Sequence, residues 1–359
     1  MPVPNAQMGF VGSVRFSGGN IGQEILVRAK SCNIRARQDI KYADDIVDSR
    51  IDTTLYSLGP KIVEGNCSFP LVHEGIVNGT TKDCGEAAAS CSTNLAGRLW
   101  RVASERDQIG RLKNQFNIDV RYTDNTAYRY PNCLINKMGI SIVNEQELDI
   151  NFDVIGGSNS TGEVREALTS ERDPVFLSPA RIVTWNDFIL NIFVREEGLF
   201  IPGSYIREFN VEVDNDVARF FTLNGRLSPQ DITARKRKVT GSIKLMGFSA
   251  KQFHEFIYNN QTRYTSQTKI KFGYTLGGSS VPYWATSLWG VLFQIEEVAI
   301  SNSLIETTIP FRALGDCEND YEAIELGGCN QSISSVGGAL GGPTSPSYFK
   351  PLTSFTPLV

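Results

Sequence analysis

The order of strand-like and helix-like segments occurs twice along this chain, and this weak internal repeat constrains the fold more than any other feature. Each copy has an opening set of strand-like segments, a long polar stretch, a further strand, a helix-like segment and closing strands. The copies span residues 11–156 and 179–315, and "INFDVIG" in the first matches "IPFRALG" in the second. Two copies are too few for a solenoid. The sequence therefore predicts two tandem copies of one domain.

Alternation of apolar and polar residues with a period of two indicates that each copy is mainly β. "FNIDVRYTD" (116–124) and "ELDINFDVI" (147–155) place apolar side chains on one face and polar side chains on the other, as half-buried antiparallel strands do. Only residues 94–107 and 249–260 carry apolar residues at helical spacing. We therefore expect two antiparallel β-sandwich or barrel-type domains, each with one helix.

Changes in composition predict where the domains begin and end. Residues 156–174 are polar and rich in Gly and Ser, and residues 329–359 are rich in Gly, Ser, Thr and Pro. We expect a first domain over 1–165, a second over 166–328 and an extended C-terminal arm over 329–359. The arm cannot bury enough apolar surface to order alone, so it is expected to order against a partner.

Charge and hydropathy exclude several classes of protein. The formal net charge is -4, with 18 basic and 20 acidic side chains in residues 1–170 and 17 and 19 in the remainder. A protein that grips nucleic acid by its phosphates needs a basic excess, which neither half has. No apolar run is long enough to span a bilayer, and the first residues lack a signal core. These features predict synthesis in a cytoplasm and no membrane span.

Residue types that carry chemistry are sparse. The chain has two histidines, no zinc-ligand spacing and no phosphate-binding loop signature. The carboxylate pairs Glu196/Glu197 and Glu296/Glu297 are interpreted as solvated turn residues. The seven scattered cysteines are expected to be mostly buried free thiols, with loop-closing disulfides as an alternative. We expect no enzyme activity and no cofactor or metal, which leaves an assembly or binding protein.

One helix between strands, a long polar loop after the first strands and an added arm resemble the tail tube proteins of long-tailed bacteriophages. That family shares its fold with the type VI secretion tube protein. The resemblance covers most of residues 11–316 and is strongest in "FNVEVDND" (209–216), "KRKVTGSIKLMGFSAKQFHEFI" (236–257) and "FQIEEVAISNSLIETTIPFRALGD" (293–316). The common family member has one such domain, so the duplication is a departure.

The resemblance implies a structural virion protein without catalytic activity. In that family six domains form a ring with a continuous inner β-barrel, and rings stack into a tube that conducts DNA during ejection. A chain with two domains is then expected to close the ring with three copies, giving pseudo-six-fold symmetry. The implied partners are further copies of itself and other tail proteins such as the tape measure, terminator, baseplate or sheath. DNA passes through without specific binding, and the protein resides in the virion tail after assembly in the host cytoplasm.

A run of four basic residues ends the long polar loop of the second copy, whereas the matching loop of the first copy is acidic. We hypothesise that these loops meet between neighbouring rings, where opposite charge sets the register. A solvated strand edge protected by charge is the main alternative, followed by nuclear targeting or a grip on DNA. The residues are Asp44, Asp45, Asp48, Asp52, Arg235, Lys236, Arg237 and Lys238.

Two other functions remain open at this point. A tube initiator or terminator ring would share the fold but form one ring instead of a polymer. A β-sandwich carbohydrate-binding module or polysaccharide hydrolase would need exposed aromatic residues beside a carboxylate pair. Trp284 and Trp289, near Glu296, are the candidates for such a site.

Overall fold

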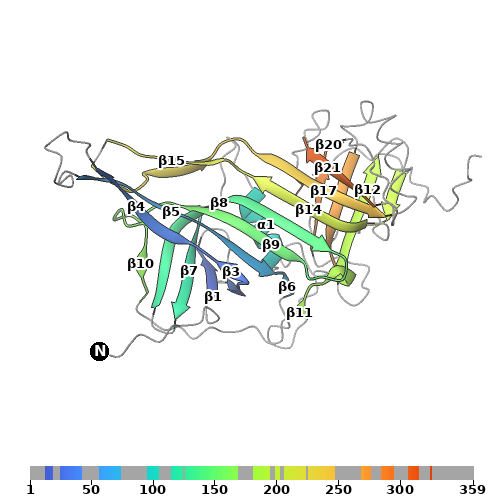
Figure 1. Cartoon of the computed structure of the whole chain (residues 1–359), viewed down its shortest axis with the longest axis horizontal. Coiled ribbons are helices and arrows are strands. Elements are labelled where there is room, and N and C mark those ends of the chain that lie inside the picture. Colours follow the sequence, from blue (N-terminus) through green and yellow to red (C-terminus); the bar gives the residue numbers. More distant parts are fainter. Residues whose placement is uncertain are drawn as a thin grey trace, which may run out of the picture.

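The protein is an elongated molecule built almost wholly from antiparallel strands (Figure 1). The computed structural model describes residues 13–18, 25–42, 56–73, 95–104, 115–123, 126–168, 181–194, 199–202, 206–223, 225–246, 268–275, 284–294, 306–314 and 324–325.

The first half folds into two facing layers that share one long strand, β8. Phe16 of one layer packs against Phe69 and Phe152 of the other, with ring centroids 6.4 and 5.5 Å apart. β8 passes between the layers at Asn132, whose φ of 49° is a conformation that asparagine tolerates. In order of pairing, the strands are β2 (Ile25–Arg28), β1 (Ser13–Ser17), β7 (Phe116–Thr123), β8 (Thr126–Val143), β9 (Asp149–Gly156), β5 (Tyr56–Pro70) and β4 (Arg35–Tyr42), with β3 (Ser31–Cys32) also on β5.

The second half repeats this order of pairing. Its long strand is broken in two at Gly290, which has a φ of 60°. The carbonyl of Gly290 accepts a hydrogen bond from the Leu314 amide at 3.0 Å, as the Asn132 carbonyl does from the Gly157 amide at 3.1 Å. In order, the strands are β13 (Leu199–Pro202), β12 (Phe188–Val194), β18 (Thr268–Tyr274) and β19 (Trp284–Trp289), then β20 (Val291–Phe293), β21 (Glu306–Ala313), β17 (Lys238–Met246) and β14 (Ile206–Asp214).

β8 and β14 join the two halves edge to edge. Their antiparallel pairing runs from Glu208 opposite Val143 to Asp214 opposite Lys137. The result is one continuous run of eight strands in the order β4, β5, β9, β8, β14, β17, β21, β20. The two ends of this run, β4 and β20, come from different halves of the chain.

Shorter elements cover the ends of these sheets. They are β6 (Val72–His73) paired with β11 (Arg181–Ile182), β10 (Glu166–Ala167) on β8, β22 (Ile324–Glu325) on β19, the hairpin of β15 (Val217–Phe220) and β16 (Asp231–Ala234), and a 3-10 turn at Trp185–Asp187.

One hydrophobic core extends through both halves, and the helix α1 (Leu95–Ser104) links them. α1 belongs to the first half but packs against β8 and against β19 of the second half. Its Trp100 is fully buried, donates a hydrogen bond to Thr286 Oγ1 at 3.1 Å and makes edge contacts with Phe272 and Trp284.

The structure confirms the mainly β fold, the strands expected at 116–124 and 147–155, and the first helix. The apolar residues assigned to the cores of these two strands are buried, except Tyr122, which is 39% exposed. The second expected helix (249–260) and the C-terminal arm (329–359) lie outside the described residues. The domain boundaries stay a prediction, since residues 157–168 fold back onto β8 through β10.

Candidate functional site

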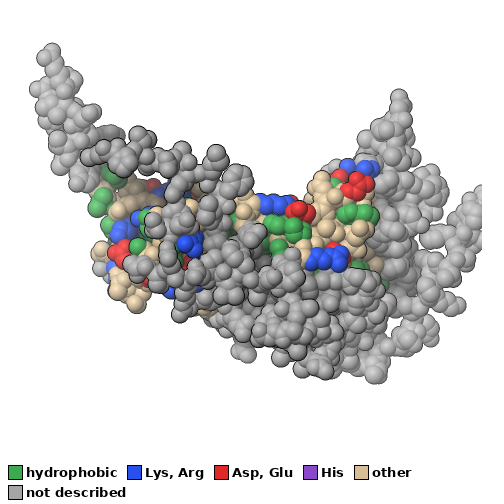
Figure 2. Space-filling model, turned by 90° about the horizontal axis from the view of Figure 1, so that it is seen from below, with side chains coloured by type: hydrophobic (Ala, Val, Ile, Leu, Met, Phe, Trp, Pro, Cys, Tyr) green, Lys and Arg blue, Asp and Glu red, His purple; other side chains and the backbone are tan. Residues whose placement is uncertain are grey.

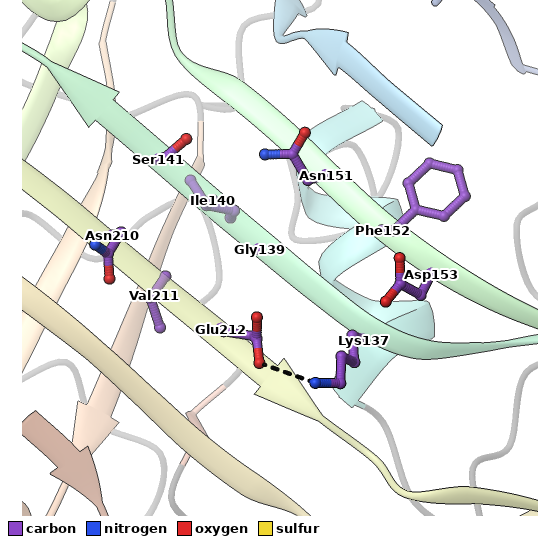
Figure 3. Close-up of a pocket in the computed structure, with 10 residues that line it drawn as sticks. All are labelled: Lys137, Gly139, Ile140, Ser141, Asn151, Phe152, Asp153, Asn210, Val211 and Glu212. Carbon is purple, nitrogen blue, oxygen red and sulfur yellow. Dashed lines mark ion pairs between the residues drawn. The ribbon is translucent and has the colours of Figure 1, made fainter. Parts of the chain in front are cut away.

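The face of the eight-strand run that points away from the core is polar. Along β8, β9 and β14 the side chains alternate, so one face is apolar and the other carries amides, hydroxyls and charges. Figure 3 shows the centre of this face, a shallow pocket of about 370 Å³. Its polar lining is Lys137, Ser141, Asn151, Asp153, Asn210 and Glu212.

Charges on this polar face are arranged in pairs. Lys137 lies 3.6 Å from Glu212 and 3.5 Å from Asp214, and these two carboxylates raise the pKa of its amine. Partial burial raises the pKa of the Asp153 carboxyl above its usual range, and Lys137 opposes that shift. Lys244 similarly lies 2.9 Å from Glu208.

Basic and acidic side chains therefore lie beside one another on this polar face, and on the side of the molecule drawn in Figure 2 the described basic and acidic side chains also lie close together. A surface of this kind is well hydrated and offers few unpaired cations to phosphate groups.

Both ends of the eight-strand run are open within the described part of the chain. β4 pairs with β5 on one side only, and β20 pairs with β21 on one side only. Open strand edges expose unpaired amides and carbonyls, which pair readily with another strand. These two edges are thus candidate sites of self-association.

The long loop of the second half forms the β15–β16 hairpin, which docks on the first half beside β5. Arg219 Nη2 donates to the Val63 carbonyl at 2.9 Å and to Glu64 Oε2 at 3.2 Å. The Lys61 amide donates to the Leu227 carbonyl at 2.7 Å. The hairpin therefore crosses from its own half to hold the neighbouring half.

Two of the four predicted basic residues have partners within the chain. Arg235 pairs with Asp216 at 2.8 Å on the surface. Arg237 donates to the Ser104 carbonyl at the C-terminus of α1 and to Asn215 Oδ1 at 3.5 Å, so its cation lies where the helix dipole favours positive charge. A structural role for Arg237 was not anticipated from the sequence, because Ser104 lies more than 130 residues away.

The other two basic residues are exposed and have no ion-pair partner among the described residues. Lys236 precedes β17, and Lys238 is its first residue. The acidic residues predicted to meet this run, Asp44, Asp45, Asp48 and Asp52, lie outside the described residues. The structure therefore places Lys236 and Lys238 at the surface, and the predicted contact between the basic and acidic loops stays a prediction.

Exposed apolar side chains lie on the β15–β16 hairpin and on the paired strands β4 and β5, and sequence reasoning missed them. On the β15–β16 hairpin, Phe220 and Phe221 are about half exposed and Leu223 is fully exposed, and Ile40 and Leu58 are about half exposed on β4 and β5. The run "RFFTL" inside a polar loop was the available signal. Clustered exposed apolar residues mark contact surfaces.

The two tryptophans proposed for a carbohydrate site are both covered by other side chains. Trp284 is 5% exposed and packs against Trp100 and Phe272 in the core, and the ring of Trp289 is covered by Lys269, whose Nζ lies 3.9 Å from the ring centroid. Glu196, Glu197, Glu296 and Glu297 lie outside the described residues.

The described residues contain no group of three or more His, Cys, Asp or Glu that could hold a metal ion. Cys32, Cys67 and Cys133 are free thiols, and the last two are buried. A hydrogen bond with Cys32 and burial raise the pKa of the Cys67 thiol, and burial raises the pKa of the Cys133 thiol. None of the helices in the described part of the chain is long and apolar enough to cross a membrane.

Comparison with known proteins gives one family. A family model described as "Phage tail tube protein" matches residues 13–313, which include both halves of the eight-strand run. No curated protein matches the chain.

Proposed function

The chain belongs to the phage tail tube protein family, and from this premise we propose that it forms three-chain rings that stack into the tube through which DNA leaves the virion. Membership in this family gives the protein a structural role in the virion tail. The ring, its stacking and the passage of DNA are the finer parts of the proposal.

The pairing of β8 with β14 is the observation that carries this proposal. Within the eight-strand run, β8 is the strand at one edge of the first half and β14 is the strand at the opposite edge of the second half, and both halves have the same pairing order. The edges still open in the described chain, β20 and β4, correspond to β8 and β14 in that order. Repeating the same contact between chains would pair every edge and close a barrel.

The internal contact also predicts the register between chains. Val213 lies opposite Met138 across the β8–β14 pair. Met138 pairs with Phe152 and Phe293 pairs with Phe311, and Phe152 and Phe311 match in the repeated motif, so Met138 corresponds to Phe293. The same counting through β5 and β17 makes Val213 correspond to Ile34. Ile34 is therefore expected opposite Phe293 of the next chain, and Arg35 opposite Leu292.

Introduced cysteines test this register. We expect the double variant Arg35→Cys/Leu292→Cys to form disulfide-linked dimers and trimers under mild oxidation, because opposed residues in an antiparallel pair lie within reach of a disulfide. The pair Arg35→Cys/Gln294→Cys keeps the same face but shifts the register by two residues, and it should cross-link poorly. The single variants control for the seven native cysteines.

Particle mass and shape test the ring itself. Light scattering should give three times the 39.7 kDa of one chain for isolated rings, and electron microscopy should show hollow stacked tubes. Equal cross-linking of both cysteine pairs, or particles whose mass is not a multiple of three chains, would contradict the proposal. Within such a tube the polar face of the eight-strand run would line the channel, and its paired charges would let DNA slide.

Assembly requires other tail proteins under this proposal. Tube length and the two tube ends need a tape measure, a terminator and a baseplate, which the chain would meet in the host cytoplasm before it becomes part of the virion.

A further inference from the structure

We infer that the basic run at Arg235–Lys238 docks the acidic segment 43–55 of a neighbouring copy within the same ring, an inference that rests on the proposed function. The run carries two exposed lysines, Lys236 and Lys238, without an ion-pair partner among the described residues. This contact lies between chains side by side in one ring, whereas the sequence had suggested a contact between stacked rings.

The β15–β16 hairpin supplies the template for this contact. It forms part of the connection between β14 and β17, and it packs on residues 61–64 at the middle of β5. In the shared pairing order, the connection between β4 and β5 is its counterpart in the first half. That connection contains residues 43–55.

Strand pairing identifies the counterpart of the docking surface. Gly65 lies opposite Val154, and Val239 lies opposite Ala313, the residue that matches Val154 in the repeated motif. Gly65 therefore corresponds to Val239. Counting back along the strands equates residues 61–64, which hold the hairpin, with residues 235–238. A neighbour's 43–55 segment that repeats the internal contact thus arrives at the basic run.

The two docking surfaces carry opposite charges at equivalent positions. In the internal contact a basic hairpin residue, Arg219, meets the acidic Glu64. Lys238 occupies the position equivalent to Glu64, and the segment that would reach it contains four aspartates and one arginine. Docking of either loop on the surface of its own half would oppose like charges, which is unfavourable. The exchange therefore favours strict alternation of first and second halves around a ring.

Carbodiimide cross-linking tests the contact directly. Rings assembled from a mixture of ¹⁵N-labelled and unlabelled chains are separated from tubes by sedimentation, cross-linked and analysed by mass spectrometry. We expect mixed-isotope peptides that join Lys236 or Lys238 to an acidic residue of 43–55 in isolated rings. The cross-link between Lys61 and Glu163, which lie 3.6 Å apart in one chain, is the internal control and should carry a single isotope.

Charge reversal gives an independent readout. The double variant Lys236→Glu/Lys238→Glu should raise the protein concentration needed for half-assembly of rings by about tenfold or more at low salt, since like charges then meet. Lys236→Arg/Lys238→Arg should leave that concentration unchanged. Adding Asp45→Lys/Asp48→Lys to the reversed variant should restore assembly.

The outcomes separate this inference from the proposed function. Rings that lack the mixed-isotope cross-link, or that show it only in stacked tubes, overturn the lateral contact while leaving the ring proposal intact. Rings whose assembly is insensitive to charge reversal also overturn it. Absence of three-chain rings under all conditions overturns both.

Discussion

Replacing Trp100 with alanine should destabilise the whole chain, because this side chain lies where the two halves meet. Trp100 is fully buried, and its indole donates a hydrogen bond to Thr286 Oγ1 at 3.1 Å. Its ring makes edge contacts with Phe272 and Trp284 at centroid distances of 5.6 and 6.0 Å. Truncation of a buried tryptophan costs about 3–5 kcal/mol of unfolding free energy, and the loss of two aromatic pairs places this site near the upper end.

Denaturant unfolding at a protein concentration below assembly measures this effect. We expect one cooperative transition in the parent, since the core is continuous, and a shift of that entire transition to lower denaturant in Trp100→Ala. Trp185→Ala removes the same side chain at a position that is 41% exposed and is the matched control, with a change within about 1 kcal/mol.

A double-mutant cycle isolates the hydrogen bond that crosses between the halves. The coupling between Trp100→Phe and Thr286→Val should be about 0.5–1.5 kcal/mol, as for other buried neutral hydrogen bonds. Two separate transitions in the parent, with Trp100→Ala moving only one of them, would refute the reasoning. They would mean that each half folds on a core of its own.

Two further predictions concern the strands of the central run. Gly65→Ala should lower the unfolding free energy by about 1–3 kcal/mol, because the added Cβ would lie 2.5 Å from Ile34 Cα and against the backbone that connects β3 to β4. Gly139→Ala is the control, because an added Cβ there would have its nearest neighbours 3.8 Å away. Equal effects of the two variants in the same denaturant assay would contradict the steric argument. Asp153→Asn should raise the unfolding free energy at neutral pH, because the folded state raises the pKa of this carboxyl and so disfavours its charged form. Denaturant unfolding from pH 7 to 3 should show the difference in unfolding free energy between variant and parent shrinking as Asp153 of the parent protonates. A difference that grows toward low pH would contradict the argument.

The fold was largely predictable from the sequence because alternation with a period of two survives in most long strands. Phe152 and Val154 face the core as their spacing indicates, and α1 begins at Leu95, within the predicted helical segment. The edge-to-edge joining of β8 and β14 could not be predicted. It depends on which open edges meet in space, and both edges have the same pattern of apolar and polar residues.

The candidate site was predictable only where charge was concentrated. The run Arg235–Lys238 was visible in the sequence, but its division into an internal helix-end contact at Arg237 and exposed lysines at 236 and 238 depends on long-range packing. The exposed side chains of Phe221 and Leu223 were missed because a short apolar run in a loop can equally well be buried. Their exposure becomes evident only in the folded hairpin.

Under the proposed three-chain ring, two halves with the same strand-pairing order in one chain would separate two requirements that a ring of single-domain chains must meet with one interface. The contact between halves of one chain forms at high effective concentration, so it can be maintained by a continuous core around Trp100 and by the hairpin of Arg219. The contact between chains must instead form only when assembly begins, and its partners must be distinguished from the internal ones. In the proposed ring, the opposite charges at positions 64 and 238 would make that distinction without altering the shared strand pairing, because side-chain charge leaves backbone hydrogen bonds unchanged. On this reasoning, a variant with Glu64→Lys and Lys238→Glu together should keep its core, because neither change touches it, but it should lose the internal contact between Arg219 and Glu64. Its rings should lose alternation and assemble at higher concentration, which light scattering across a concentration series measures.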